Sequence, residues 1–389
     1  MKLAYTRGQP AALEAVGAMV AGAPPHAILL AGPEGVGKTT LALDLAAGLL
    51  CTASDPADRP CRACRACRMV EHGNHPDLHW LRPAGPGGQV VIGGPDARFR
   101  GVRDLIAELA LLPVEGGARV AIIERADRMN DDAQSALLKT LEEPPAGVAI
   151  VLCANDEERM LPTVRSRCAR VRLGPVGPRA IEEILAEHDL ADAPAAARLG
   201  RLAGGRPGVA IAYARAPEAA AIRGELAREL LDLVDARAST RLAAARTLVA
   251  RAGDLVAILD RGAPAGDDAE PAPEPSPDAS PEAAPESAPD GGQKRAPAAE
   301  RRRGAAMLLS VWVDVARDLA LVGAGERTSL HDPGLLEELE GVARDVPPSD
   351  VAAFLERLAR AGELLDVNVA PELLLDALVL AWPARTKAA

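Results

Sequence analysis

The chain has 389 residues, of which 48% are hydrophobic and only 2% aromatic, and its formal net charge is −11 at pH 7. This length can bury the cores of two or three domains, and with few aromatic side chains Ala, Leu and Val must do the packing, which favours helices over β-sandwiches. Eight acidic residues and no basic residue lie within residues 263–292. The remainder is therefore close to neutral, and the total charge says little about partners.

Neither a membrane span nor a secretion signal is evident in the sequence. No run of about 18 apolar residues occurs, and the N-terminus, MKLAYTRGQPAALEAV, lacks the continuous apolar segment and cleavage site of a signal peptide. We therefore expect a cytoplasmic chain with no membrane contact. In that compartment the six cysteines are expected to be metal ligands or free thiols rather than disulfides.

The first 175 residues alternate short apolar runs with helical patterns. Three runs are typical of buried parallel strands: AILLA (27–31), RVAIIE (119–124) and VAIVLCA (148–154). Helical patterns follow them at 38–50, 100–112 and 131–143. This order predicts an α/β domain over residues 1–175, with a parallel sheet that carries helices on both faces.

GPEGVGKTT (32–40) fits the phosphate-binding pattern G-x-x-x-x-G-K-[ST] and lies between the first expected strand and its helix, as the motif requires. In that setting backbone N–H groups can surround a phosphate, the Lys38 side chain can reach the outer phosphates, and Thr39 can ligate Mg²⁺. The motif predicts binding of a nucleoside di- or triphosphate but not hydrolysis. The expected nucleotide-binding residues of this loop are Gly32, Gly35, Val36, Gly37, Lys38, Thr39 and Thr40.

Hydrolysis requires acidic groups beyond the phosphate loop. A hydrolytic P-loop protein usually carries an Asp for Mg²⁺ at the end of a later strand, and a neighbouring acid that polarises water. Here Glu124 stands at the first position and can still reach a metal ion, whereas Arg125 at the second cannot accept a proton. Asp127 can substitute in principle, although it lies two residues further on. Unless the acids follow another strand, we expect hydrolysis to be weak or absent.

Four of the six cysteines lie within residues 51–67, with the spacing C-x9-C-x2-C-x2-C. Four thiolates suit tetrahedral Zn²⁺ and leave no open position for a catalytic water, so this pattern predicts a structural zinc site. An iron–sulfur cluster is the weaker alternative, because the spacing departs from the usual ferredoxin runs. His72, His75 and His79 follow closely but are not needed to complete the site. The expected ligands are Cys51, Cys61, Cys64 and Cys67.

The second half of the chain has a helical pattern with one interruption. Residues 176–215 show short helical patterns broken by GGRPG (204–208), and 217–262 and 304–385 are helical throughout. Between them, residues 263–303 are rich in Pro, Ala and charged residues and have no apolar periodicity. Such a segment cannot bury enough surface to offset its ordering entropy, so we expect a disordered insertion there.

Residues 127–168, DRMNDDAQSALLKTLEEPPAGVAIVLCANDEERMLPTVRSRC, resemble bacterial DNA polymerase III clamp-loader subunits. The phosphate loop, the four-cysteine segment and NHPDLHWL (74–81) occur there in the same order. The resemblance implies an AAA+ P-loop domain, a small helical lid at 176–215, and an all-α collar domain that joins a hetero-oligomer. It also implies ATP or ADP with Mg²⁺ as ligand.

The resemblance further implies partners and residue roles. Gamma/tau and delta subunits would share the complex, which places a sliding clamp on primer–template DNA as part of the DNA polymerase III holoenzyme in replication. Arg167, in Ser166-Arg167-Cys168, falls at the position of the arginine that enters the ATP site of a neighbouring subunit. Asn155 falls at the position of a polar residue that senses the γ-phosphate.

Within this family the sequence most resembles the delta-prime type, a stator that does not itself turn over ATP. Motor subunits carry an acidic pair where this chain has Glu124-Arg125, and a lid arginine where Gly208 stands. A gamma/tau-type motor remains the alternative. A free-standing zinc-containing DNA-binding protein would need basic runs interleaved with aromatic residues, which the sequence lacks. A small-molecule P-loop kinase would explain neither the SRC motif nor the helical second half.

Overall fold

The computed structural model describes residues 3–85, 88–95, 97–115, 117–262, 298–366 and 369–385. The chain divides into two compact units, Met1–Arg215 and Ala216–Ala389. In the described part of the chain, none of the helices combines the length and the hydropathy needed to cross a membrane.

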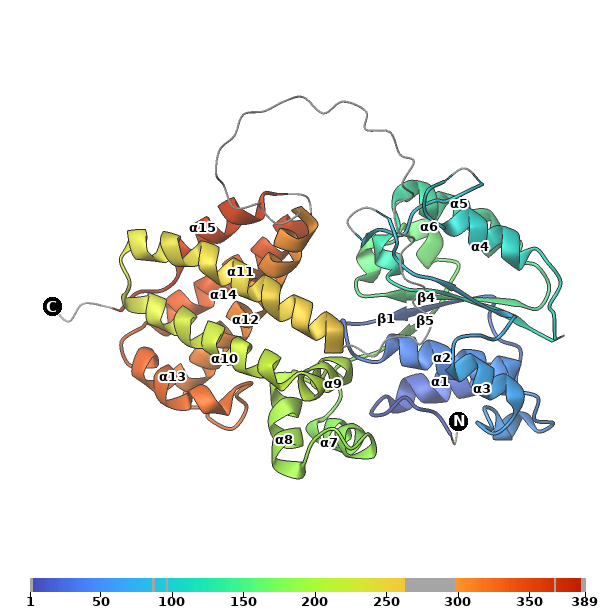
Figure 1. Cartoon of the computed structure of the whole chain (residues 1–389), viewed down its shortest axis with the longest axis horizontal. Helices are drawn as coiled ribbons and strands as arrows, with labels where there is room; N and C mark the ends of the chain where they lie inside the picture. The colour runs from blue at the N-terminus through green and yellow to red at the C-terminus, as the bar shows by residue number, and fades with distance from the viewer. Residues whose placement is uncertain are drawn as a thin grey trace, which may run out of the picture. The chain divides into compact units, whose positions relative to one another are not determined.

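The first unit is built on a five-stranded parallel sheet (Figure 1). Every residue of β1, β3 and β4 is buried, because these central strands are covered on both faces. The sequence therefore shows them as apolar runs, apart from Arg119 at the start of β3. The three predicted strands are confirmed. The strand order is β2-β3-β4-β1-β5, with β1 (Ala27–Ala31), β2 (Leu78–Leu81), β3 (Arg119–Ile123), β4 (Val148–Ala154) and β5 (Ala169–Arg172).

Helices cover both faces of this sheet, as predicted (Figure 1). Alternate strand residues supply the two cores: Leu29 and Ile123 belong to one core, and Ile28 and Ile122 to the other. The first core includes α4 (Val102–Leu109), α5 (Asp131–Glu142) and α6 (Pro162–Arg165). The second includes α1 (Pro10–Ala21), α2 (Lys38–Leu50) and α3 (Arg65–Glu71). Single 3-10 turns are η1 (Pro56–Asp58), η3 (Ala126–Arg128) and η4 (Glu157–Arg159).

Three short helices complete the first unit and enclose a small core of their own. They are α7 (Pro178–Glu187), α8 (Ala193–Leu202) and α9 (Pro207–Arg215), and Ile181, Leu185 and Ala210 are buried between them. The turn into α9 requires glycine at position 205, where φ is +79° and a Cβ atom would lie 2.6 Å from Pro175 Cβ.

All secondary structure described in the second unit is helical. A cluster of Trp312, Phe354 and Trp382, with ring centroids 4.8–5.5 Å apart, forms the centre of its core. Its elements are α10 (Pro217–Asp232), η5 (Leu233–Asp235), α11 (Ala238–Gly262), α12 (Ala298–Gly323), η6 (Pro333–Leu335), α13 (Leu336–Ala343), α14 (Pro348–Asp366) and α15 (Pro371–Ala381).

The insertion expected at 263–303 falls largely outside the described residues, which exclude 263–297. Residues 298–303, expected in the insertion, instead form the start of α12. Their sequence, AAERRR, consists of strong helix formers that continue directly into the apolar helix, so the helix begins earlier than the change in composition indicates.

Candidate nucleotide site and cysteine cluster

The phosphate loop joins β1 to the N-terminus of α2. Gly32 and Gly35 have φ of +156° and +80°, and a Cβ atom on Gly32 would lie 2.1 Å from the backbone oxygen of Leu173, so the loop requires glycine there. Gly37 is also left-handed and precedes the first turn of α2. The loop therefore brings successive backbone N–H groups to the positive end of a helix, an arrangement that suits an anion.

Lys38 lies at the start of α2 and is only 7% exposed. Its Nζ donates hydrogen bonds of 2.7 Å to the backbone oxygens of Gly32 and Pro33, so the ammonium group lies within the curve of the loop. Burial lowers the pKa of Lys38, while the nearby carboxylates Glu34 and Asp127 act in the opposite direction. Val36 is buried, whereas Thr39 and Thr40 are half-buried.

Four polar side chains from three segments form a ring beside this loop. Arg125 Nη1 donates to Glu34 Oε1 over 3.4 Å, and Asn155 Nδ2 donates to Glu34 Oε2 over 3.5 Å. On the other side of the ring, Asp127 Oδ1 accepts the Asn155 N–H at 2.9 Å, and Asp127 Oδ2 lies 3.9 Å from Arg125 Nε. Asn155 therefore lies beside the loop, at the end of β4. Glu34 was not among the predicted site residues, because no spacing rule distinguishes it from other loop residues.

Glu124, predicted as the last residue of this strand, lies one residue beyond the end of β3 and is half-buried. Burial raises the pKa of its carboxyl group, although Arg82, whose Nε lies 4.0 Å from Glu124 Oε1, opposes this effect. Arg82 itself stacks over the Trp80 ring at 4.4 Å. Glu124 is thus an acid whose ionised form is partly desolvated and already lies beside a cation.

Gly208, in α9, contacts the phosphate loop through its backbone. Its N–H donates to the Gly35 oxygen at 2.9 Å, and a Cβ atom at position 208 would lie 3.3 Å from both Cα and O of Gly35. Where the family resemblance implies an arginine in motor subunits, this chain therefore makes a close backbone contact.

Arg167 lies just beyond α6. Its Nη1 donates to the backbone oxygen of Thr163 at 2.8 Å, and its Nη2 forms an ion pair with Glu142 at the end of α5. The Arg167 side chain is 34% exposed. Both contacts come from the same face of the sheet, so the guanidinium is positioned but remains accessible to solvent.

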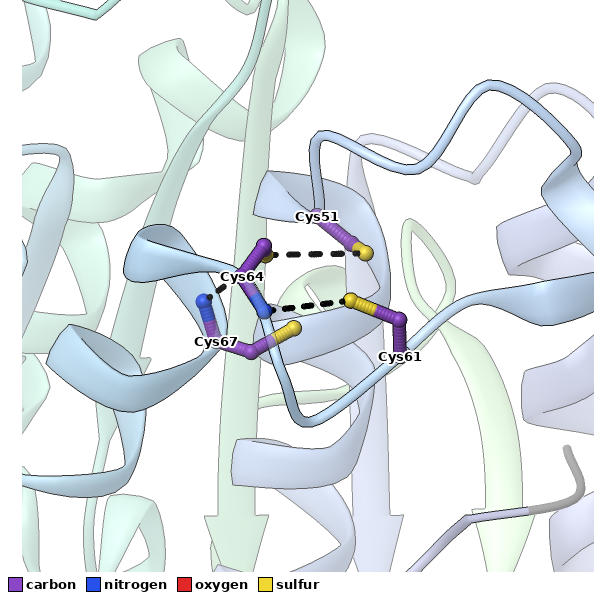
Figure 2. Close-up of side chains that lie close together, drawn as sticks. All are labelled: Cys51, Cys61, Cys64 and Cys67. Atoms are coloured by element: carbon purple, nitrogen blue, oxygen red, sulfur yellow. Dashed lines mark hydrogen bonds between the residues drawn. The ribbon is translucent and has the colours of Figure 1, made fainter.

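The four cysteines predicted as metal ligands converge (Figure 2). Their Sγ atoms all lie within 4.8 Å of one another, and those of Cys51 and Cys64 are 4.0 Å apart. Tetrahedral zinc, with Zn–S bonds of about 2.3 Å, would separate its sulfurs by about 3.8 Å, so the cluster fits the ion closely. The nearby histidines lie elsewhere: His75 accepts a hydrogen bond from the Asp77 N–H, and His79 pairs with Glu108.

Backbone N–H groups favour the thiolate forms that a metal needs. Cys64 N–H points to Cys61 Sγ and Cys67 N–H to Cys64 Sγ, each at 3.4 Å, as Figure 2 shows. Burial raises the pKa of Cys64, but hydrogen bonds such as the one from Cys67 outweigh it and bring the pKa to about 6. For Cys51 and Cys67, burial dominates and raises the pKa.

The cysteine segment is tied to the phosphate-loop helix by a buried carboxylate. Asp44, in α2, is fully buried and accepts hydrogen bonds from the N–H groups of Tyr5 and Thr6, each at 2.9 Å. It also pairs with Arg62, which lies between two of the cysteines. One side chain thus connects the N-terminal segment, α2 and the cysteine loop.

The first unit is similar in sequence to known subunits of DNA polymerase III. Residues 9–177 match the family described as "DNA polymerase III, delta subunit". The chain is 39% identical over 184 residues to DNA polymerase III subunit delta' of Pseudomonas aeruginosa, covering 47% of this chain and 53% of the relative. It is 34% identical over 174 residues to subunit delta' of Bacillus subtilis, covering 45% and 49%.

Subunit tau of Salmonella typhimurium is 33% identical over 178 residues, covering 45% of this chain and 26% of the relative. The match spans about half the length of the delta' relatives. The family match includes the phosphate loop, the four cysteines and Arg167. Over residues 9–177 the chain is thus similar to DNA polymerase III subunits, among them delta' and tau.

Proposed function

We propose that this chain is a delta-prime-type subunit of the DNA polymerase III clamp loader, a stator that donates Arg167 to a neighbouring ATPase subunit. The observation that carries this proposal is at the end of β3, where a hydrolytic subunit needs a second acid. Arg125 occupies that position, and a guanidinium cannot take a proton from water. The half-buried Glu124 beside Arg82 is a poor substitute, since its ionised form is disfavoured by burial.

The phosphate loop nevertheless retains the features that bind a nucleotide. Its left-handed glycines present backbone N–H groups, and Lys38 lies inside the curve, where phosphate oxygens can replace the two carbonyl oxygens it now contacts. ATP or ADP fits this site. Mg²⁺, which would offset phosphate charge, would be held by Thr39, with Glu124 as a weaker second ligand.

Arg167 is the proposed catalytic contribution of this chain. Its guanidinium lies just after α6, is partly exposed, and makes only contacts that rotation of its side chain can release. In a neighbouring ATP site it would neutralise negative charge that develops on the γ-phosphate. Gamma/tau and delta subunits are the proposed partners, the helical second unit is the proposed collar, and the sliding clamp and primer–template DNA are engaged through the complex.

Structural zinc is proposed for the four cysteines, because their spacing and backbone hydrogen bonds fit four thiolate ligands. Bound zinc would cross-link the end of α2 to the start of α3. Asp44 and Arg62 extend that cross-link to the N-terminal segment.

A gamma/tau-type motor subunit is the second candidate, favoured by the complete phosphate loop and by the 33% identity to a tau subunit. The two candidates differ in what the isolated chain does with ATP, since a motor carries its own hydrolytic groups.

Reconstitution of a loader with gamma/tau and delta subunits tests the stator proposal. Arg167→Ala should leave assembly intact and abolish turnover at the one site that receives the arginine, where such a residue accelerates hydrolysis about a thousandfold or more. Arg170→Ala, which removes an exposed arginine three residues away, serves as the matched control. Unchanged DNA-stimulated turnover with Arg167→Ala would refute the role.

A further inference from the structure

The Glu34 carboxylate is approached by two donors from two different strands. Arg125, after β3, and Asn155, after β4, direct a guanidinium nitrogen and an amide nitrogen to its two oxygens, at 3.4 Å and 3.5 Å. Two convergent donors beside a phosphate loop form an anion-binding arrangement. The anion they hold in this structure belongs to the loop itself.

The backbone of Arg125 adopts a strained conformation. Its φ is +51°, a left-handed conformation that is uncommon and unfavourable for residues other than glycine. Asp127 is almost completely buried and holds the ring from below, through the Asn155 N–H and Arg125 Nε. The buried Asp127 carboxylate therefore helps to keep the guanidinium directed at the loop.

The Glu34 carboxylate, in contrast, is easily displaced. Its side chain is 70% exposed and both of its hydrogen bonds are long, so releasing it to water costs little. Its two donors follow β3 and β4, and β4 lies between β3 and β1, where the outermost phosphate of a nucleotide in a P-loop lies. Lys38 is buried within the loop, where its Nζ donates to the Gly32 and Pro33 oxygens, and Gly208 supplies no side chain from α9.

We infer that Arg125 binds the terminal phosphate of a nucleoside triphosphate held in this chain's own phosphate loop. On binding, the Arg125 guanidinium releases the Glu34 carboxylate and pairs with that phosphate instead. The inference rests on the proposed nucleotide binding and deepens it. Arg125 then contributes to nucleotide binding, at the position where a hydrolytic subunit carries an acid. The loop distinguishes triphosphate from diphosphate by an ion-pair exchange, without hydrolysis.

Calorimetric titration of the zinc-loaded full chain with ADP and with the non-hydrolysable analogue AMP-PNP, both with Mg²⁺, tests this exchange. Arg125→Gln should weaken AMP-PNP binding by about tenfold or more, the usual loss for a charge-assisted hydrogen bond, and change ADP binding by less than about twofold. Glu34→Gln should tighten AMP-PNP binding and leave ADP unchanged, because the competing carboxylate is gone. In the double variant Arg125→Gln/Glu34→Gln, the tighter AMP-PNP binding produced by Glu34→Gln should be lost.

Arg82→Gln is the matched control, because it removes an equal charge near Glu124 without facing Glu34. It should shift the affinities for the two nucleotides together, and thermal unfolding of each variant checks that the fold is retained. Equal losses for ADP and AMP-PNP in Arg125→Gln, or weaker AMP-PNP binding in Glu34→Gln, would overturn the inference and leave nucleotide binding intact. Absence of binding of either nucleotide to the unsubstituted chain would overturn both.

Discussion

The Gly208 N–H donates a 2.9 Å hydrogen bond to the Gly35 oxygen, so the first turn of α9 rests directly on the phosphate loop. The approach is close enough that even one methyl group would be crowded, since a Cβ atom at position 208 would lie 3.3 Å from two Gly35 backbone atoms. The three-helix segment and the loop are therefore in direct backbone contact.

This closeness predicts that Gly208→Ala will not give the stability that alanine usually brings to a helix. Gly200→Ala, in α8, should stabilise the first unit by about 0.5–1 kcal/mol, because its new methyl group meets Ile181 at an ordinary 3.7 Å. Gly208→Ala should lose that gain to crowding and fall below Gly200→Ala by about 1 kcal/mol or more. Chemical unfolding of the two variants measures the difference, and equal stabilities would contradict the contact.

Removal of one cysteine ligand should release the metal. Cys64→Ser replaces a sulfur that lies 4.0 Å from Cys51 Sγ and accepts a hydrogen bond from the Cys67 N–H, and should lower zinc content well below one ion per chain. We expect the first unit to lose on the order of 3 kcal/mol of stability or more, because zinc binding free energy is folding free energy. Cys168→Ser, outside the cluster, is the control. Colorimetric zinc release measures the stoichiometry, and full zinc content in Cys64→Ser would disprove this ligand set.

Arg241 should be among the most sensitive positions of the second unit. It is 5% exposed, and its guanidinium donates to five backbone oxygens, which include Trp382 at 2.6 Å and Val234 at 3.0 Å. Arg241→Met fills the volume but leaves those oxygens unpaired, so we expect a loss of about 3–5 kcal/mol. Urea unfolding followed by tryptophan fluorescence measures it. The exposed Arg357→Met should change stability by less than about 0.5 kcal/mol, and a similarly small effect at Arg241 would show that its hydrogen bonds contribute little.

The buried Glu124 carboxyl group should make the stability difference between the unsubstituted chain and Glu124→Gln depend on pH. Burial raises the pKa of its carboxyl group above the ordinary value of 4.5, so the folded chain binds this proton more tightly than the unfolded chain. The ionised carboxylate therefore destabilises the fold, an effect fully present above the folded pKa and absent below about 4.5. Glu124→Gln should unfold at higher urea than the unsubstituted chain at pH 8, and the two should converge as the pH falls to 4.5. A difference in urea midpoint that grows as the pH falls would contradict this prediction.

The central sheet was predictable where burial is complete and unpredictable where it is not. β1, β3 and β4 are buried at every residue and therefore appear as apolar runs. β2 and β5 were not among the predicted strands. β5 contains Arg170 and Arg172 and is an edge strand with one buried residue, and β2 is only four residues long, so neither leaves a clear period in the sequence.

Some parts of the candidate site could be predicted from the sequence, and others could not. The phosphate loop and the cysteine cluster are local motifs, whose residue types and spacing specify their chemistry. The ring of Glu34, Arg125, Asp127 and Asn155 joins segments 28 to 121 residues apart, and such a pairing depends on sheet topology rather than on spacing. The sequence pointed to Arg125 as an anomaly, but only the fold brings it to Glu34.

Phosphate release by the isolated, zinc-loaded chain at saturating ATP tests the central claim most directly. The claim is that this loop holds nucleotide while Arg125, in place of an acid, leaves it without a hydrolytic group. We predict release no faster than that of a Lys38→Ala variant, whose loop cannot hold the phosphates, even though the unsubstituted chain binds AMP-PNP. Sustained release well above the Lys38→Ala rate would contradict the stator account and favour the motor alternative.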